Sequence, residues 1–154
     1  MNRYCVEKWQ NHKHLLEQAL NEYPDLESLD YESLMNLCVK HILNTGLDKY
    51  DDRFYKPNVV VAYGGQYSGE VLFVIVPENG FSGFLVSYTE YGSCAFCDTL
   101  EHIIWEFIYE KKITREEAIK DLMSVCKDMV CNIVKPYNQG FSYDARFDTI
   151  EVKL

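Results

Sequence analysis

Hydrophobic residues recur at helical spacing in the first part of the chain. Between residues 31 and 42, apolar side chains occupy positions i, i+3, i+4, i+7, i+8 and i+11, which places them on one face of a helix. Asp30 or Ser28 would cap the start of this helix. A looser stripe predicts an earlier helix over residues 4–21, and Pro24 ends that pattern.

Two more helices are predicted in the second half of the chain. Apolar residues within 100–108 form a single stripe, with acidic residues largely outside it. Thr114 and Glu117 have the spacing of a capping box, in which each residue satisfies a backbone N–H at the start of a helix. The helix that they begin would run to about residue 134, because Pro136 prevents its continuation.

Between these helical regions, branched and aromatic residues predict three strands. They are Val59–Tyr63, Val71–Val76 and Phe84–Tyr88. Short glycine-containing turns separate them, and connections this short require antiparallel hairpins. Val71–Val76 has no polar alternation, so we expect it to be the central strand, buried on both faces. Residues 147–154 are expected to add an edge strand.

Together these elements predict a single α+β domain over residues 1–154. Its sheet is a three-stranded antiparallel meander packed by about four helices, with a further C-terminal edge strand. A chain of 154 residues fits one hydrophobic core. We assign its regions as helical 1–46, meander 58–90, helical 96–135 and tail strand 146–154.

The charge is unevenly distributed along this domain. The net charge is −9 at pH 7, and residues 58–99 contain no lysine or arginine. Because nucleic-acid binding requires clustered cations, we expect no direct binding to nucleic acid. The field would instead attract a protein with a basic surface, although an acidic excess also serves solubility alone. The candidate binding face consists of Tyr63, Tyr67, Glu70, Glu78, Tyr88, Glu90, Tyr91 and Asp98.

The chain shows no signal for export or membrane insertion. Its N-terminal region has no apolar stretch typical of a secretory signal. The longest apolar run, residues 71–76, is far shorter than the ~20 residues that span a bilayer. We therefore expect a cytoplasmic protein without a membrane partner. In that reducing compartment the six cysteines would be thiols or metal ligands rather than disulfides.

The pair Cys94-x-x-Cys97 is the local motif that suggests chemistry. It lies where a strand is followed by a helix, and the positive end of a helix lowers the pKa of a nearby thiol. This position favours a thiol-redox pair. Against that interpretation, the preceding segments resemble an antiparallel meander rather than a βαβ unit, and the adjacent Asp98 opposes thiolate formation.

The same two cysteines are also candidate metal ligands. A zinc site would need two more ligands, and Cys126 with Cys131 is the weak candidate pair. Five residues along a helix separate side chains by about 140° around its axis, so these two do not point at one ion. We expect no cofactor, with zinc as the alternative.

A third interpretation of the segment is structural. Gly92 would permit a tight turn, Ser93 or Cys94 would cap the following helix, and Cys97 would pack as a small residue beneath it. Asp98 suits the positive end of that helix. The remaining residues offer no recognisable catalytic arrangement, since the four histidines are scattered and no G-x-S-x-G is present. The chain is therefore expected to be non-enzymatic.

The segment from Tyr91 to Leu100, YGSCAFCDTL, resembles a family of small hypothetical proteins from bacteriophages and mobile elements of gut Firmicutes. In that family the segment reads approximately Y-G-S-C-x-x-C-D-x-L, and the resemblance covers residues 59–108. The resemblance implies a phage or prophage origin and no particular activity. Small acidic phage proteins often inhibit host defence proteins such as CRISPR nucleases, presenting carboxylates in place of phosphates.

These observations give two hypotheses. The first is an acidic protein-binding domain that is a phage-encoded inhibitor or modulator of a host protein with a basic surface. The alternative is a thiol-redox or zinc-stabilised domain that uses Cys94 and Cys97.

Overall fold

The computed structural model describes residues 3–48, 54–63, 68–78, 84–92, 98–136 and 149–150. It confirms the α+β class. In chain order its elements are α1 (Arg3–Asn21), η1 (Leu26–Ser28), α2 (Tyr31–Cys38), η2 (Val39–Leu43), β1 (Tyr55–Tyr63), β2 (Ser68–Pro77), β3 (Leu85–Gly92), α3 (Thr99–Ile108), α4 (Arg115–Cys131), β4 (Lys135–Pro136) and β5 (Thr149–Ile150).

The helices begin where the sequence provides caps. Asp30 caps α2, with its Oδ1 accepting a hydrogen bond from Ser33 N at 2.7 Å. Thr114 and Glu117 form the expected capping box at the start of α4. Both caps satisfy N–H groups that would otherwise have no partner in the first helical turn. None of the described helices is long and apolar enough to cross a membrane.

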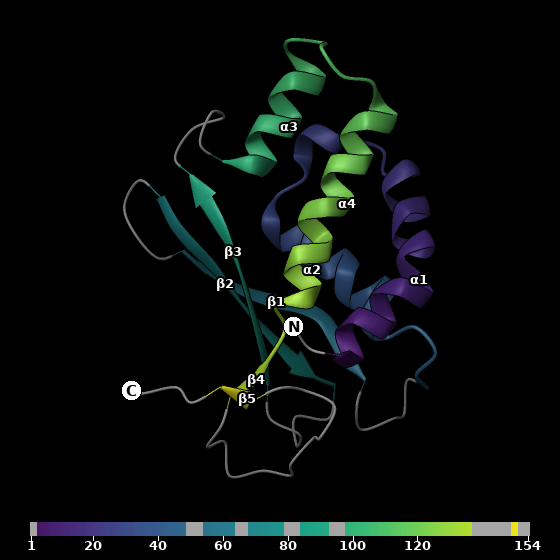
Figure 1. Cartoon of the computed structure of the whole chain (residues 1–154), viewed down its shortest axis with the longest axis vertical. Coiled ribbons are helices and arrows are strands. Elements are labelled where there is room, and N and C mark those ends of the chain that lie inside the picture. Colours follow the sequence, from purple (N-terminus) through teal and green to yellow (C-terminus); the bar gives the residue numbers. More distant parts are fainter. Residues whose placement is uncertain are drawn as a thin grey trace.

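The sheet has the strand order β1-β2-β3, and both pairings are antiparallel. The helices gather on one side of it (Figure 1), where α2 contacts β1 and β2, and α4 contacts β3. β1 begins several residues before the hydrophobic run, because the Asn44 side chain exchanges two hydrogen bonds with the backbone of Tyr55. Pro57 has no backbone N–H, and it is tolerated within β1 because an edge strand pairs with a neighbour on one side only.

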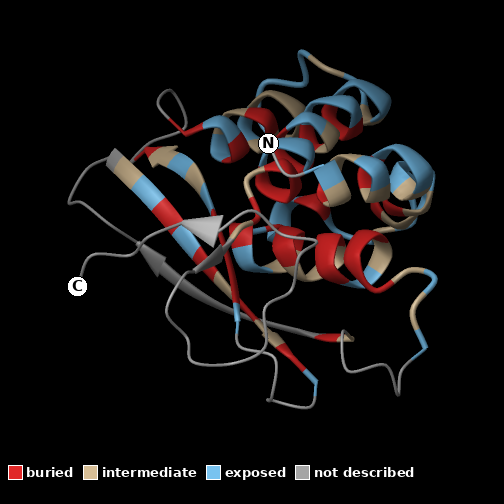
Figure 2. Ribbon diagram, turned by 60° about the horizontal axis from the view of Figure 1, so that its bottom comes forward, coloured by how far each residue is buried: buried red, intermediate tan, exposed pale blue. Residues whose placement is uncertain are grey.

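β2 is the central strand, but only one of its faces is buried. Val71, Phe73 and Ile75 are fully buried beneath the helices, whereas Leu72 is 41% exposed. Figure 2 shows this alternation of burial along the sheet strands. The prediction that both faces of the strand are buried was therefore wrong. A continuous apolar run does not show whether one or both faces of a sheet are covered. Here the described helices cover one face.

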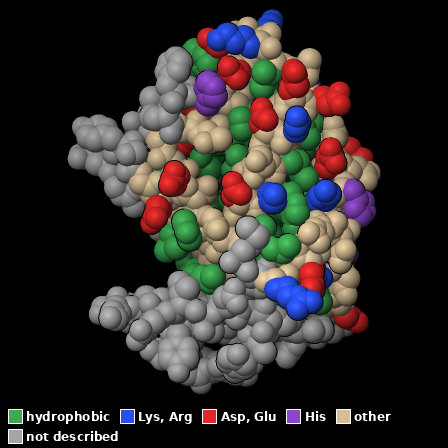
Figure 3. All heavy atoms as spheres, viewed as in Figure 1, with side chains coloured by type: hydrophobic (Ala, Val, Ile, Leu, Met, Phe, Trp, Pro, Cys, Tyr) green, Lys and Arg blue, Asp and Glu red, His purple; other side chains and the backbone are tan. Residues whose placement is uncertain are grey.

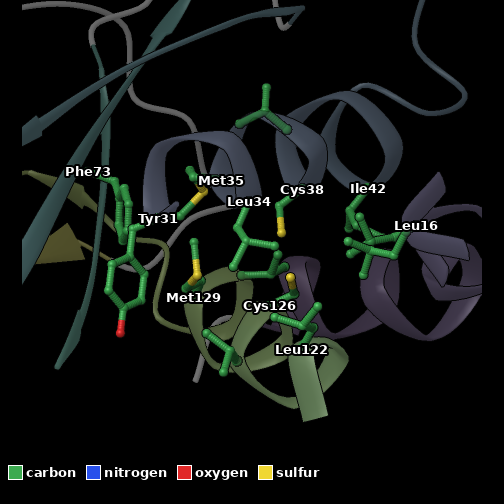
Figure 4. Packing of buried hydrophobic residues seen from close by; sticks show 14 of the residues in the cluster. Leu16, Tyr31, Leu34, Met35, Cys38, Ile42, Phe73, Leu122, Cys126 and Met129 are labelled. Carbon is green, nitrogen blue, oxygen red and sulfur yellow. The ribbon is translucent and has the colours of Figure 1, made fainter. Parts of the chain in front are cut away.

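The core lies between the sheet and the helices α1, α2 and α4. Its side chains interdigitate from all three helices (Figure 4), with Leu16 on α1, Met35 on α2 and Met129 on α4 among the fully buried residues. Phe73 contributes from the sheet. This single apolar cluster fits one domain.

After α4 the chain turns alongside β3. Val134 and Val86 exchange two backbone hydrogen bonds in an antiparallel bridge, so the chain borders the β3 edge before β4. β4 then pairs in parallel with β5. Two residues of the predicted tail strand, Thr149–Ile150, are thus in a strand, and that strand pairs with β4 rather than with the meander. The rest of the predicted tail strand lies outside the described residues.

Candidate protein-binding surface

Two glutamates of the predicted binding face lie directly opposite each other on neighbouring strands. Glu70 on β2 is the cross-strand partner of Glu90 on β3, and both side chains are exposed. Carboxylates in opposite positions of an antiparallel pair repel each other and destabilise the sheet. A sequence selected for stability alone would place a cation at one of these positions, so this pair suggests a role outside folding.

The next pair on the same face is apolar and also exposed. Leu72 is paired with Tyr88, and these side chains are 41% and 46% exposed. Residues two apart on a strand share a face, so the four side chains form one surface on the side of the sheet away from the helices. We name it the acidic sheet patch, defined as Glu70, Leu72, Tyr88 and Glu90. Figure 3, in the view of Figure 1, shows acidic and hydrophobic side chains interspersed with cations on the face that includes α4.

The patch borders a hollow beside β3. The hollow measures about 430 Å³ and lies between β3, the start of α3 and the last turns of α4. Tyr88 and Glu90 line it together with Asp128, while no lysine or arginine is among the described lining residues. Asn132 fixes the end of α4 to β3 by donating from Nδ2 to the Tyr88 carbonyl at 3.4 Å. The acidic character of the patch therefore continues onto α4.

The other predicted face residues are not gathered here. Glu78 is exposed but follows the far end of β2, about 26 Å from Glu70 at the usual rise per strand residue. Tyr91 is half-buried. Tyr63 is paired with Val71 at the end of β1, and its side chain lies outside the described residues, as does all of Tyr67.

Asp98 was predicted as a surface charge, and this prediction was wrong. The residue is only 3% exposed and is the N-cap of α3. Its carboxylate accepts hydrogen bonds from Tyr31 Oη at 3.0 Å, Gly92 N at 3.0 Å and Glu101 N at 2.9 Å. The expected cap at Ser93 or Cys94 is thereby replaced. Three donors, one of them in the first turn of a helix, compensate for burying the charge.

Cys94 and Cys97 lie outside the described residues. Their candidate co-ligand Cys126 is fully buried on α4, where its side chain faces Cys38 of α2 (Figure 4). A hydrogen bond between these two thiols, together with burial, raises the pKa of Cys38 well above its ordinary value. Cys131 is also buried, which raises its pKa.

This placement does not fit a four-cysteine zinc site. Cys126 would have to leave the core and its contact with Cys38 to reach a metal shared with Cys131. Within the described parts of the chain, no group of three or more metal-ligating side chains is close enough to hold an ion. The described residues therefore supply no ready donor set for zinc.

Comparison with known proteins adds no relative. No protein family, curated protein or solved structure matches the chain. The function must therefore be argued from the surfaces themselves.

Sequence reasoning missed Leu72 as a surface residue. The run Val71–Val76 is uniformly apolar, so nothing in it separates the buried positions from the exposed ones. Its neighbour Glu70 was the available signal, because a charged residue at the start of the run marks which alternate positions face water. Trp105 on α3 and Tyr109, which directly follows α3, were also missed, and they are 39% and 58% exposed.

Proposed function

We propose that the protein is a non-enzymatic binding domain whose acidic sheet patch contacts a basic surface on a partner protein. The observation that carries this proposal is the opposition of Glu70 and Glu90 beside the exposed pair Leu72 and Tyr88. A partner's cation between the two glutamates would remove their repulsion, and the apolar pair would supply contact area that excludes water. Asp128, in the adjoining hollow, would add a third charge.

The resemblance of the segment 91–100 to phage proteins supports a more specific role. We propose that the partner is a host defence protein of the kind that binds nucleic acid, such as a CRISPR-type nuclease. Carboxylates on a sheet face would then occupy positions that phosphates take in the partner's basic channel. The net charge of −9 would speed the approach to such a channel at low salt.

Affinity capture from a host lysate tests the proposal with a charge-matched control. The test bait carries Glu70→Lys and Glu90→Lys. The control bait carries Glu17→Lys and Asp121→Lys, which change the net charge equally at exposed positions of α1 and α4. We expect the wild-type and control baits to retain the same basic protein in stoichiometric amounts and the test bait to lose it. Because exposed charges carry the contact, retention should fall as salt is raised.

Two results would contradict the proposal. One is that both charge-reversed baits lose the partner equally, since net charge rather than the patch would then be responsible. The other is that the test bait retains the partner as the wild type does. A circular dichroism spectrum of each bait confirms that both remain folded.

A further inference from the structure

A second concave surface lies at the end of β3, where η1 meets the first turns of α3. This groove has a volume of about 280 Å³. Its apolar wall comes from Leu29, Leu100 and Ile104, of which the first two are buried. Small-molecule sites usually measure about 300–1,000 Å³, so a groove of this size suits one long side chain better than a cofactor.

The charges around the groove have one sign. Glu27 and Glu101 line it from η1 and α3 and are exposed. Asp98 lies deeper, and its oxygens already accept three hydrogen bonds. No lysine or arginine is among the described residues that line the groove. The groove is therefore complementary to a cation that also has an apolar stem.

An exposed aromatic pair adjoins the same rim. The rings of Trp105 and Tyr109 lie 4.8 Å apart between centroids, with 31° between their planes. Tyr109 Oη donates to Glu27 Oε1 at 2.7 Å, which joins the pair to the groove. This hydrogen bond raises the pKa of Tyr109, so the phenol stays protonated as a donor. Exposed tryptophan and tyrosine are the side chains most enriched among residues that dominate binding energy.

We infer that this groove receives an arginine side chain of a partner protein. Arginine has an apolar stem that would lie along Leu100 and Ile104, while its planar guanidinium would stack on Trp105 and bond to Glu101. Lysine fits less well, because its ammonium neither stacks nor forms forked hydrogen bonds. The inference rests on the proposed function in that the arginine belongs to a protein partner. The groove shares no residue with the acidic sheet patch, so either can fail alone.

An NMR titration of the full chain with the capped tripeptide Gly-Arg-Gly tests the inference. The chain has two tryptophans, and the buried Trp9 on α1 is an internal control for the exposed Trp105. We expect a saturable shift of the Trp105 indole and of the Glu101 and Ile104 amides, with no shift of the Trp9 indole. The matching citrulline peptide, which has the same shape without the charge, should bind about tenfold more weakly or not at all.

Two variants complete the test. Glu101→Gln keeps the size of the side chain and should weaken binding of the arginine peptide by about tenfold. Glu116→Gln, at an exposed position of α4, should leave it unchanged. The Glu70→Lys and Glu90→Lys chain should bind the peptide as the wild type does, because its groove is intact. Equal shifts with arginine and citrulline, or unchanged binding after Glu101→Gln, would overturn the inference.

Discussion

At the scale of single residues, the buried carboxylate of Asp98 joins three segments that are distant in sequence. It caps α3, accepts from the side chain of Tyr31 at the start of α2 and accepts from the backbone at the end of β3. The hydrogen bonds of one side chain therefore connect both helical regions to the sheet. This role positions the start of α3, and with it the groove, relative to β3.

Replacing Asp98 by alanine should destabilise the fold more than removing an ordinary cap. Loss of a helix cap costs about 1 kcal/mol, and leaving the buried Gly92 N–H without its carboxylate acceptor costs about 1–3 kcal/mol more. The matched control is Asp30→Ala, which removes the exposed cap of α2 alone. Urea denaturation of both variants measures the difference. Equal losses would show that the buried hydrogen bonds of Asp98 contribute nothing.

The two thiols of Cys38 and Cys126 should be unreactive while the protein is folded. Both are fully buried, and the raised pKa of Cys38 keeps its reactive thiolate rare at neutral pH. Because folding raises the pKa of Cys38, the contribution of this thiol to the free energy of unfolding is complete below the pKa of an unfolded cysteine. It is lost as the pH rises through the folded value.

Alkylation followed by mass mapping checks this expectation. Ser124→Cys provides a reactive control at an exposed position of α4, the helix that carries Cys126. We expect the introduced thiol to react rapidly at neutral pH, and Cys38 and Cys126 to react only after unfolding. Rapid reaction of the two native thiols in the folded chain would show that the core opens at α2 and α4.

At the scale of elements, the helices were predicted well because two local signals, hydrophobic spacing and capping residues, agree. Asp30, Thr114 and Glu117 act within one turn of their helices, so the sequence around them contains the whole signal. The start of β1 was not predictable in this way. It depends on Asn44, which lies eleven residues earlier and meets Tyr55 only in the folded chain.

The faces of β2 were also outside local prediction. Whether an apolar strand is buried on one face or on both depends on which distant elements cover it. The described helices cover the side of Phe73 and leave that of Leu72 partly exposed. The same reasoning applies to the acids: Glu70, Glu90 and Asp98 look alike in sequence, and only tertiary contacts distinguish an exposed pair from a buried cap.

Adjacent substitutions on β2 should therefore have unequal effects on stability. Phe73→Ala removes a fully buried ring and should cost about 3–5 kcal/mol. Leu72→Ala removes a side chain that is 41% exposed on the other face and should cost about 1 kcal/mol or less. Thermal or urea denaturation measures both. A loss at Leu72 as large as that at Phe73 would mean that the outer face of the sheet is also covered.

At the scale of the whole molecule, the two sides of the sheet differ in what covers them. One side of the sheet holds the helices and the core (Figure 2), while the described residues of the other side include the exposed Glu70, Leu72, Tyr88 and Glu90. The charge distribution of this part of the chain could be predicted from the sequence, since residues 58–99 contain no cation. Its geometry could not, because the opposition of Glu70 and Glu90 depends on strand register.

Site-specific photo-crosslinking in host cells tests the central claim most directly. A benzoylphenylalanine replaces Tyr88 in the acidic sheet patch, and a second chain carries it at Gln18, an exposed position on α1. We predict that irradiation couples one basic host protein to position 88 and none to position 18. We also predict that adding Glu70→Lys and Glu90→Lys abolishes the adduct. Coupling of equal yield from both positions, or an adduct at 88 that survives the two charge reversals, would contradict the account.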